Sequence, residues 1–125
     1  MTTGRELADL DRSVLWHPFT QQQSWMDEDF PVIDCADDTT LYDTEGNAYI
    51  DGVSSLWCTV HGHRHPSLDA AIRRQLDAVA HSTMLGLSHP SAIELGAKLV
   101  DLAPEGLQRV FYSDSGSTAV EPLSE

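Results

Sequence analysis

Ser113-Asp114-Ser115-Gly116-Ser117-Thr118-Ala119-Val120-Glu121 follows an apolar run at residues 110–112. An apolar run, small polar residues with one glycine, and then helix-compatible residues predict a strand, a tight turn and the start of a helix. The first turn of a helix leaves backbone N–H groups without partners and carries positive potential, so it favours anions. Gly116 would let the backbone approach such a ligand closely. The stretch therefore predicts a phosphate or other anion site, flanked by hydroxyl groups of Ser115, Ser117 and Thr118.

Composition and charge restrict the kind of protein. The chain has 125 residues, enough for one domain, and its 41% hydrophobic residues and mean hydropathy of −0.26 suit a soluble globular protein. A net charge of −13 argues against binding to nucleic acid or to anionic membranes. No apolar run approaches the roughly 20 residues that span a bilayer, and residues 1–12 lack the apolar segment of a signal peptide. With two cysteines, too few for a disulfide framework, these features predict a cytoplasmic protein.

The remaining patterns predict short strands early in the chain and helices later. Apolar residues recur with helical spacing over 67–80 and 91–102, and Ser91 and Glu94 have the spacing of a capping box. Partial alternation on both sides of residues 43–47 predicts a hairpin. The predicted order is a helical lead-in over 1–14, an extended segment at 15–20, strands from residue 32 and within 40–50, an irregular stretch at 53–66, the two helices with a loop at 81–89 between them, and a strand at 108–112.

This order is the beginning of an α/β layer fold rather than a complete one. A parallel sheet needs several strands joined by crossovers, and the strand predicted at 108–112 has no partner in the sequence. Pro122 would fall past the first turn of the last helix, where proline costs about 3 kcal/mol. We therefore expect the front of a larger protein, with residues 122–125 as a truncated or frameshifted end.

Other chemistries fit the sequence less well. Cys58, His61, His63 and His65 invite a zinc site, but Gly62 and Pro66 break regular structure there, and a turn whose histidines cap a helix or line a cleft is the preferred interpretation. Neither a nucleophile elbow nor a Walker A loop is present. An ordinary turn with a serine N-cap remains the alternative to the anion site at residues 115–118. Two roles stay open for Trp16 and Phe19: anchors for a terminal arm, or part of a pocket.

Four motifs together resemble one enzyme family. They are Leu15-Trp16-His17-Pro18-Phe19-Thr20-Gln21, Asp51-Gly52-Val53-Ser54-Ser55-Leu56-Trp57, His61-Gly62-His63-Arg64-His65-Pro66 and the stretch 113–121. In this order they resemble the aminotransferases of biotin biosynthesis that convert 8-amino-7-oxononanoate to 7,8-diaminononanoate. These are class III, fold-type I pyridoxal-phosphate enzymes and are usually homodimers. The resemblance implies an incomplete α/β fold of this type, with an N-terminal arm and small β unit over 1–53 and the start of the cofactor-binding domain over 54–125.

The resemblance also implies roles for single residues. Gly116 and Ser117 match positions that hold the phosphate of pyridoxal 5'-phosphate. Phe19, Leu56 and Trp57 match substrate-binding positions, and no residue matches a metal ligand. Phe19 stands where many members have Tyr, and Leu56 stands where enzymes that use S-adenosylmethionine have Trp. These departures resemble a subgroup that includes users of lysine, so the implied amino donor is S-adenosylmethionine or lysine.

The lysine content sets a limit on this function. Lys98 is the only lysine in the sequence, and it lies on the polar face of a predicted helix, four residues after Glu94. That spacing predicts an exposed ion pair rather than a buried Schiff-base amine. The resemblance implies that the catalytic lysine lies beyond the matched segment, so the chain is expected to be inactive alone, with no catalytic residue of its own. The alternative hypothesis is a non-catalytic remnant or interaction protein.

Overall fold

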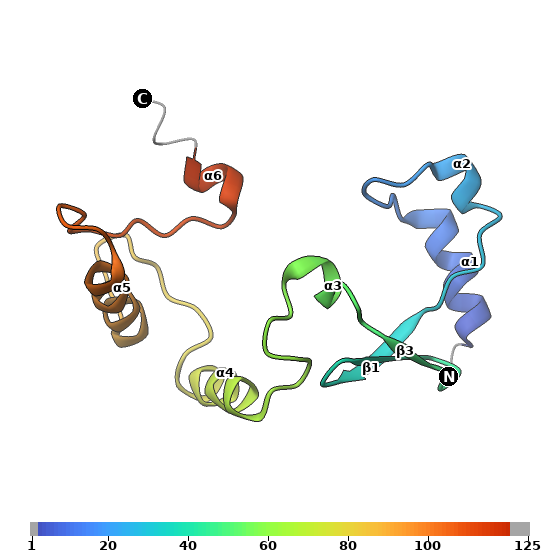
Figure 1. The fold of residues 1–125 in the computed structure, drawn as a ribbon, viewed down its shortest axis with the longest axis horizontal. Helices are drawn as coiled ribbons and strands as arrows, with labels where there is room; N and C mark the ends of the chain where they lie inside the picture. Colours follow the sequence, from blue (N-terminus) through green and yellow to red (C-terminus); the bar gives the residue numbers. More distant parts are fainter. Residues whose placement is uncertain (1–2, 121–125) are drawn as a thin grey trace. The chain divides into compact units, whose positions relative to one another are not determined.

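The computed structural model describes residues 3–120, which fall into two compact units, one ending at Gln75 and the other starting at Leu76. Glu121 and the unusual end at 122–125 lie outside the described residues. In chain order (Figure 1), the elements are α1 (Gly4–Val14), α2 (Gln22–Trp25), β1 (Ile33–Asp37), β2 (Thr40–Asp43), β3 (Ala48–Ile50), α3 (Ser54–Trp57), α4 (Pro66–Ala78), α5 (Pro90–Leu102) and α6 (Gly116–Val120).

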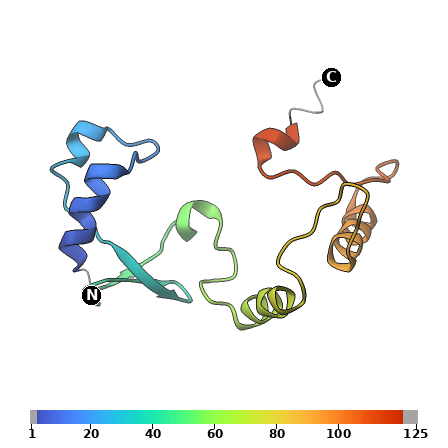
Figure 2. The same ribbon diagram turned by 180° about the vertical axis from the view of Figure 1, so that it is seen from behind.

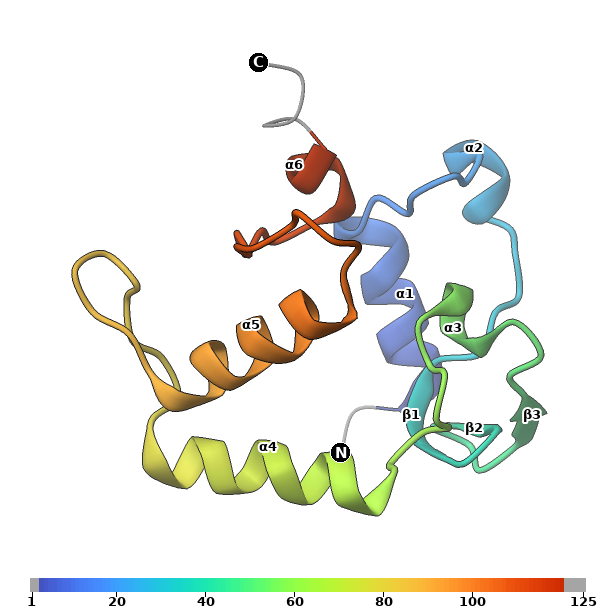
Figure 3. The same cartoon turned by 60° about the vertical axis from the view of Figure 1, so that its left-hand side comes forward.

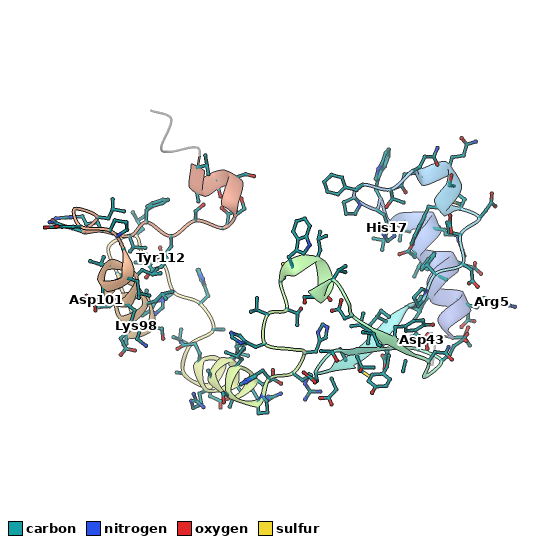
Figure 4. All side chains as sticks on the ribbon, in the orientation of Figure 1. Arg5, His17, Asp43, Lys98, Asp101 and Tyr112 are labelled. Atoms are coloured by element: carbon teal, nitrogen blue, oxygen red, sulfur yellow. The ribbon has the colours of Figure 1, made fainter. Side chains whose placement is uncertain are left out.

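The N-terminal arm is held by a cluster of rings around one carboxylate. His17 Nε2 lies 2.9 Å from Asp11 Oδ1, and Trp25 Nε1 donates to the same oxygen at 3.0 Å. Trp25 also stacks on Phe30, with 4.2 Å between ring centroids. Phe19, one of the two residues considered as anchors, is fully exposed, and so is most of the Trp16 side chain. The aromatic anchors of the arm are therefore Trp25 and Phe30, and Figure 4 shows His17 beside α1.

The three strands form the predicted hairpin and one further antiparallel pair, in the order β1-β2-β3. Figure 2 shows this part of the chain from behind. Asp43, at the end of β2, is the one buried residue among those described, with 8% of its surface exposed. Its Oδ1 accepts hydrogen bonds from the backbone N–H groups of Glu45 and Asn47, both at 2.9 Å. Its Oδ2 accepts from Asn47 Nδ2 at 2.9 Å and from the Tyr49 hydroxyl at 2.8 Å. One carboxylate therefore closes the loop and joins it to β3.

These hydrogen bonds make hairpin stability depend on pH. The side-chain amide of Asn47, followed by the Tyr49 hydroxyl, lowers the pKa of Asp43 from 3.8 to about 2. A lowered folded-state pKa means that the stabilisation is complete above the ordinary pKa and is lost as the pH falls from about 4 to about 2.

Asp43→Asn is expected to loosen the hairpin at neutral pH, because the NH2 group of the amide, at either oxygen position, would face two donors and could accept neither hydrogen bond. Backbone amides of Glu45 and Asn47 should exchange with solvent about tenfold faster, as measured by NMR hydrogen exchange. Asp34→Asn, at an exposed carboxylate of β1, is the matched control and should leave those rates unchanged. Equal exchange rates in the two variants would contradict this role for Asp43.

The second unit confirms one helix and corrects two details of the prediction. The helix predicted at 91–102 forms as α5, but its N-cap is His89, whose Nδ1 accepts from Ala92 N, rather than a capping box starting at Ser91. Residues 108–112 form no strand, because no described backbone segment pairs with them. The Tyr112 hydroxyl instead donates to the carbonyl oxygen of Ala92 at 2.6 Å. Figure 3 shows α5 along its length, and α4 confirms the helix predicted at 67–80.

Neither unit encloses an apolar core, since no large apolar side chain among the described residues is buried. Burial of such side chains is the main favourable term in folding, so the two units carry little of the usual stabilisation. No described helix is long and apolar enough to cross a membrane. The exposed apolar stripes include Leu68, Ile72 and Leu76 on α4 and Ile93, Leu95 and Leu99 on α5.

Candidate functional site

The predicted anion turn forms a well-connected helix start in the second unit. Ser115 is the N-cap of α6: its hydroxyl accepts from Thr118 N at 3.2 Å, and its carbonyl oxygen accepts from Ala119 N at 2.9 Å. The Thr118 hydroxyl donates to Asp114 Oδ1 at 3.0 Å and accepts from Ser115 N at 3.1 Å. Two of the three hydroxyls named in the sequence therefore serve the turn itself, which confirms the serine N-cap.

Gly116 and Ser117 are the remaining members of the turn. Neither backbone N–H, nor the Ser117 hydroxyl, has a hydrogen-bond acceptor among residues 3–120, and both residues are exposed. A Cβ added at Gly116 would meet no atom within 4 Å, so the space above this residue is open. Two free N–H groups and a free hydroxyl at one helix start are donors of the kind that fits a phosphate.

The three predicted substrate residues lie in the first unit and share an uncommon backbone conformation. Phe19 has φ 52°, Leu56 has φ 60° and Trp57 has φ 69°. This left-handed region is disfavoured for residues other than glycine, asparagine and aspartate. Leu56 is 60% exposed and Trp57 80% exposed, so both residues face solvent and do not pack against the rest of the unit. Leu56 and Trp57 share the turn α3, while the donors at Gly116 and Ser117 belong to the other unit.

A carboxylate that the sequence analysis did not select lies next to this turn. Asp51 accepts from Ser55 N and from the Ser55 hydroxyl, each at 2.8 Å, and its Oδ2 lies 2.8 Å from His63 Nε2. The hydrogen bond from the Ser55 backbone, followed by the one from His63, lowers the pKa of Asp51 to about 2. A signal was present, because an aspartate at the start of a turn often accepts hydrogen bonds from backbone N–H groups a few residues further along the chain.

The histidines of 61–65 serve structure in this part of the chain. His63 pairs with Asp51, and the rings of His61 and His65 meet edge to face with centroids 6.0 Å apart. Within the described residues, no group of three histidine, cysteine, aspartate or glutamate side chains could hold a metal ion.

Lys98 lies on the exposed face of α5, as Figure 4 shows, and Asp101 is on the same helix. No carboxylate of residues 3–120 is within ion-pair distance of its amine, so the ion pair predicted with Glu94 does not form. The exposure of the lysine agrees with its predicted place on a polar surface.

Comparisons with known proteins agree on one family. The model of the family "Aminotransferase class-III" matches residues 22–122. The chain is 64% identical over 115 residues to the adenosylmethionine-8-amino-7-oxononanoate aminotransferase of Nitratidesulfovibrio vulgaris, covering 92% of this chain and 21% of that protein. It resembles the crystal structure of the enzyme of this name from Methanocaldococcus jannaschii with TM-score 0.89 and 39% identity, over 94% of this chain and 27% of the other.

A second solved structure is also similar to the chain. This is the omega transaminase of Pseudomonas jessenii in complex with PMP, at TM-score 0.84 and 27% identity, covering 94% of this chain and 26% of that one. In each case the chain spans about a quarter of the relative's length. The fold is therefore a partial fold-type I α/β arrangement with a three-stranded sheet. The family model covers most of the sequence, and the chain belongs to the class III aminotransferases.

Proposed function

We propose that this chain is the N-terminal part of an aminotransferase that converts 8-amino-7-oxononanoate to 7,8-diaminononanoate in biotin biosynthesis. The observation that carries the proposal is the 64% identity to a relative named for this reaction. In the proposed assignment, residues 1–53 are the arm and β unit, and residues 54–125 begin the cofactor-binding domain. The complete enzyme would be a homodimer.

Class III aminotransferases depend on pyridoxal phosphate, and the exposed donors of the α6 turn fit the phosphate of that cofactor. We assign the backbone N–H groups of Gly116 and Ser117 and the Ser117 hydroxyl to this contact. The bound cofactor supplies the electron sink for amino transfer. The role of the chain's own residues is to anchor the phosphate and so to fix the cofactor's orientation.

We further propose that Phe19, Leu56 and Trp57 form an apolar part of the substrate site. Their exposed side chains offer a surface for the carbon chain of 8-amino-7-oxononanoate. Phe19 lacks the hydroxyl with which Tyr could form a hydrogen bond to the substrate that supplies the amino group. The identity of that substrate is therefore open, and S-adenosylmethionine and lysine are both candidates. We assign the Schiff-base lysine to a part of the enzyme outside this chain, because Lys98 is exposed on α5 and a Schiff-base amine needs an enclosed site.

A composite enzyme tests this function. It is made by replacing the matched segment of the Nitratidesulfovibrio vulgaris relative with this chain. We expect the composite enzyme to restore growth without biotin in a bacterium that cannot make 7,8-diaminononanoate. Growth only after 7,8-diaminononanoate is added, from a composite enzyme that is folded and produced normally, would contradict the proposal.

A further inference from the structure

The turn α3 has a conformation that its own sequence does not favour. Four consecutive residues, Ser54, Ser55, Leu56 and Trp57, have φ values of 51°, 47°, 60° and 69°, and none is glycine. Each residue in the left-handed region is disfavoured by contact between its Cβ and the backbone. Such a run persists only where surrounding groups hold it in place. The side chains of Leu56 and Trp57 are exposed and so supply little of this support.

The support comes from the carboxylate of Asp51, a half-buried residue whose side chain is almost covered. The Asp51 side chain is 5% exposed, and its two oxygens receive the backbone N–H and the hydroxyl of Ser55. These two hydrogen bonds fix the position of Ser55, the second residue of the turn. Within the turn, Trp57 N then donates to Val53 O at 2.8 Å, and Cys58 N donates to Ser54 O at 2.9 Å.

His63 connects this carboxylate to the sheet. Its Nε2 lies 2.8 Å from Asp51 Oδ2, and its backbone exchanges two hydrogen bonds with Asp38 at the corner between β1 and β2. Gly62 permits the close approach, because a Cβ there would lie 2.6 Å from Asp38 Oδ1 and the residue has φ 77°. Asp51 N also donates to Thr39 O at 2.9 Å. The turn is thus fixed to the most regular part of the first unit.

We propose that Asp51 is a positioning residue that holds the α3 turn so that Leu56 and Trp57 face the substrate. The hydrogen bond with His63 keeps the Asp51 carboxylate in place. The part of this inference that concerns the substrate rests on the proposed function. The part in which Asp51 fixes the turn, called here the hold on the turn, concerns this chain alone. Asp51 itself touches no reacting atom. Its loss should free the turn to leave the left-handed region and should weaken substrate binding more than turnover.

The test compares Asp51→Ala, Asp51→Asn and the control Asp34→Asn in the composite enzyme. For Asp51→Ala we expect the KM for 8-amino-7-oxononanoate to rise about tenfold, with kcat and cofactor affinity within about twofold. Hydrogen exchange of the Trp57 and Cys58 amides should be about tenfold faster. Asp51→Asn retains one acceptor and should show smaller changes of the same kind, and Asp34→Asn should show none.

Each result decides part of the inference. Unchanged amide exchange in a folded Asp51→Ala enzyme would overturn the hold on the turn, and so would an equal effect of Asp34→Asn. Faster exchange with unchanged KM would overturn the link to substrate. If Asp51→Ala fails to fold, Asp51→Asn carries the same comparison. An inactive but folded unmodified composite enzyme would count against the proposed function, and the exchange rates would still support or overturn the hold on the turn.

Discussion

Replacing Gly116 with valine in the composite enzyme is expected to weaken pyridoxal phosphate binding roughly a hundredfold, because the side chain would occupy the space assigned to the phosphate. The open surroundings of Gly116 make the variant informative, since an added Cβ meets no protein atom within 4 Å. The fold should therefore tolerate the change, and the loss should fall on the ligand. Titration of the apoenzyme with the cofactor, followed by absorbance, measures the affinity.

Ser117→Ala gives a milder form of the same test. Loss of one hydroxyl that donates to a charged phosphate should weaken cofactor binding roughly tenfold. The matched control is Ser88→Ala, at an exposed serine of the same unit, which should leave the affinity unchanged. Affinity equal to the unmodified enzyme in both Gly116→Val and Ser117→Ala would contradict the assignment of the phosphate to this turn.

The second prediction concerns Lys98 and the ability of the isolated chain to bind the cofactor covalently. The 125-residue chain mixed with pyridoxal phosphate is expected to show no specific Schiff-base absorbance and no amino transfer, because its one lysine is exposed on α5. In the composite enzyme, Lys98→Ala should leave kcat/KM within about twofold, as for other surface changes. Borohydride reduction followed by peptide mapping locates the lysine that carries the cofactor.

Two results would contradict this account of Lys98. One is a pyridoxyl label on Lys98 in the composite enzyme. The other is a Schiff-base band in the isolated chain that Lys98→Ala removes. Either would place the catalytic amine inside this segment.

Local signals predicted most of the secondary structure. Helical periodicity located α4 and α5, and the glycine and asparagine of the 43–47 loop located the hairpin. The N-cap of α5 was wrong by two residues, because the ring nitrogen of His89 caps the helix in place of the Ser91 hydroxyl. The strand at 108–112 was wrong because a strand requires a partner, and the described chain offers none.

The candidate site was predicted unevenly. Small residues and one glycine at a helix start are readable in a sequence, and the turn at 115–118 forms as expected. The left-handed turn at 54–57 was recognised only as irregular, since no glycine marks it. Asp51 and His63 are twelve residues apart, and only the folded path around the sheet brings them to 2.8 Å.

Amino transfer by the purified composite enzyme tests the proposed function most directly. The enzyme is loaded with pyridoxal phosphate and given 8-amino-7-oxononanoate with either S-adenosylmethionine or lysine, and 7,8-diaminononanoate is quantified by mass spectrometry. The proposed function predicts product with at least one donor, at a rate within about tenfold of the unmodified Nitratidesulfovibrio vulgaris relative. A folded composite enzyme that binds the cofactor and forms no product with either donor would contradict it.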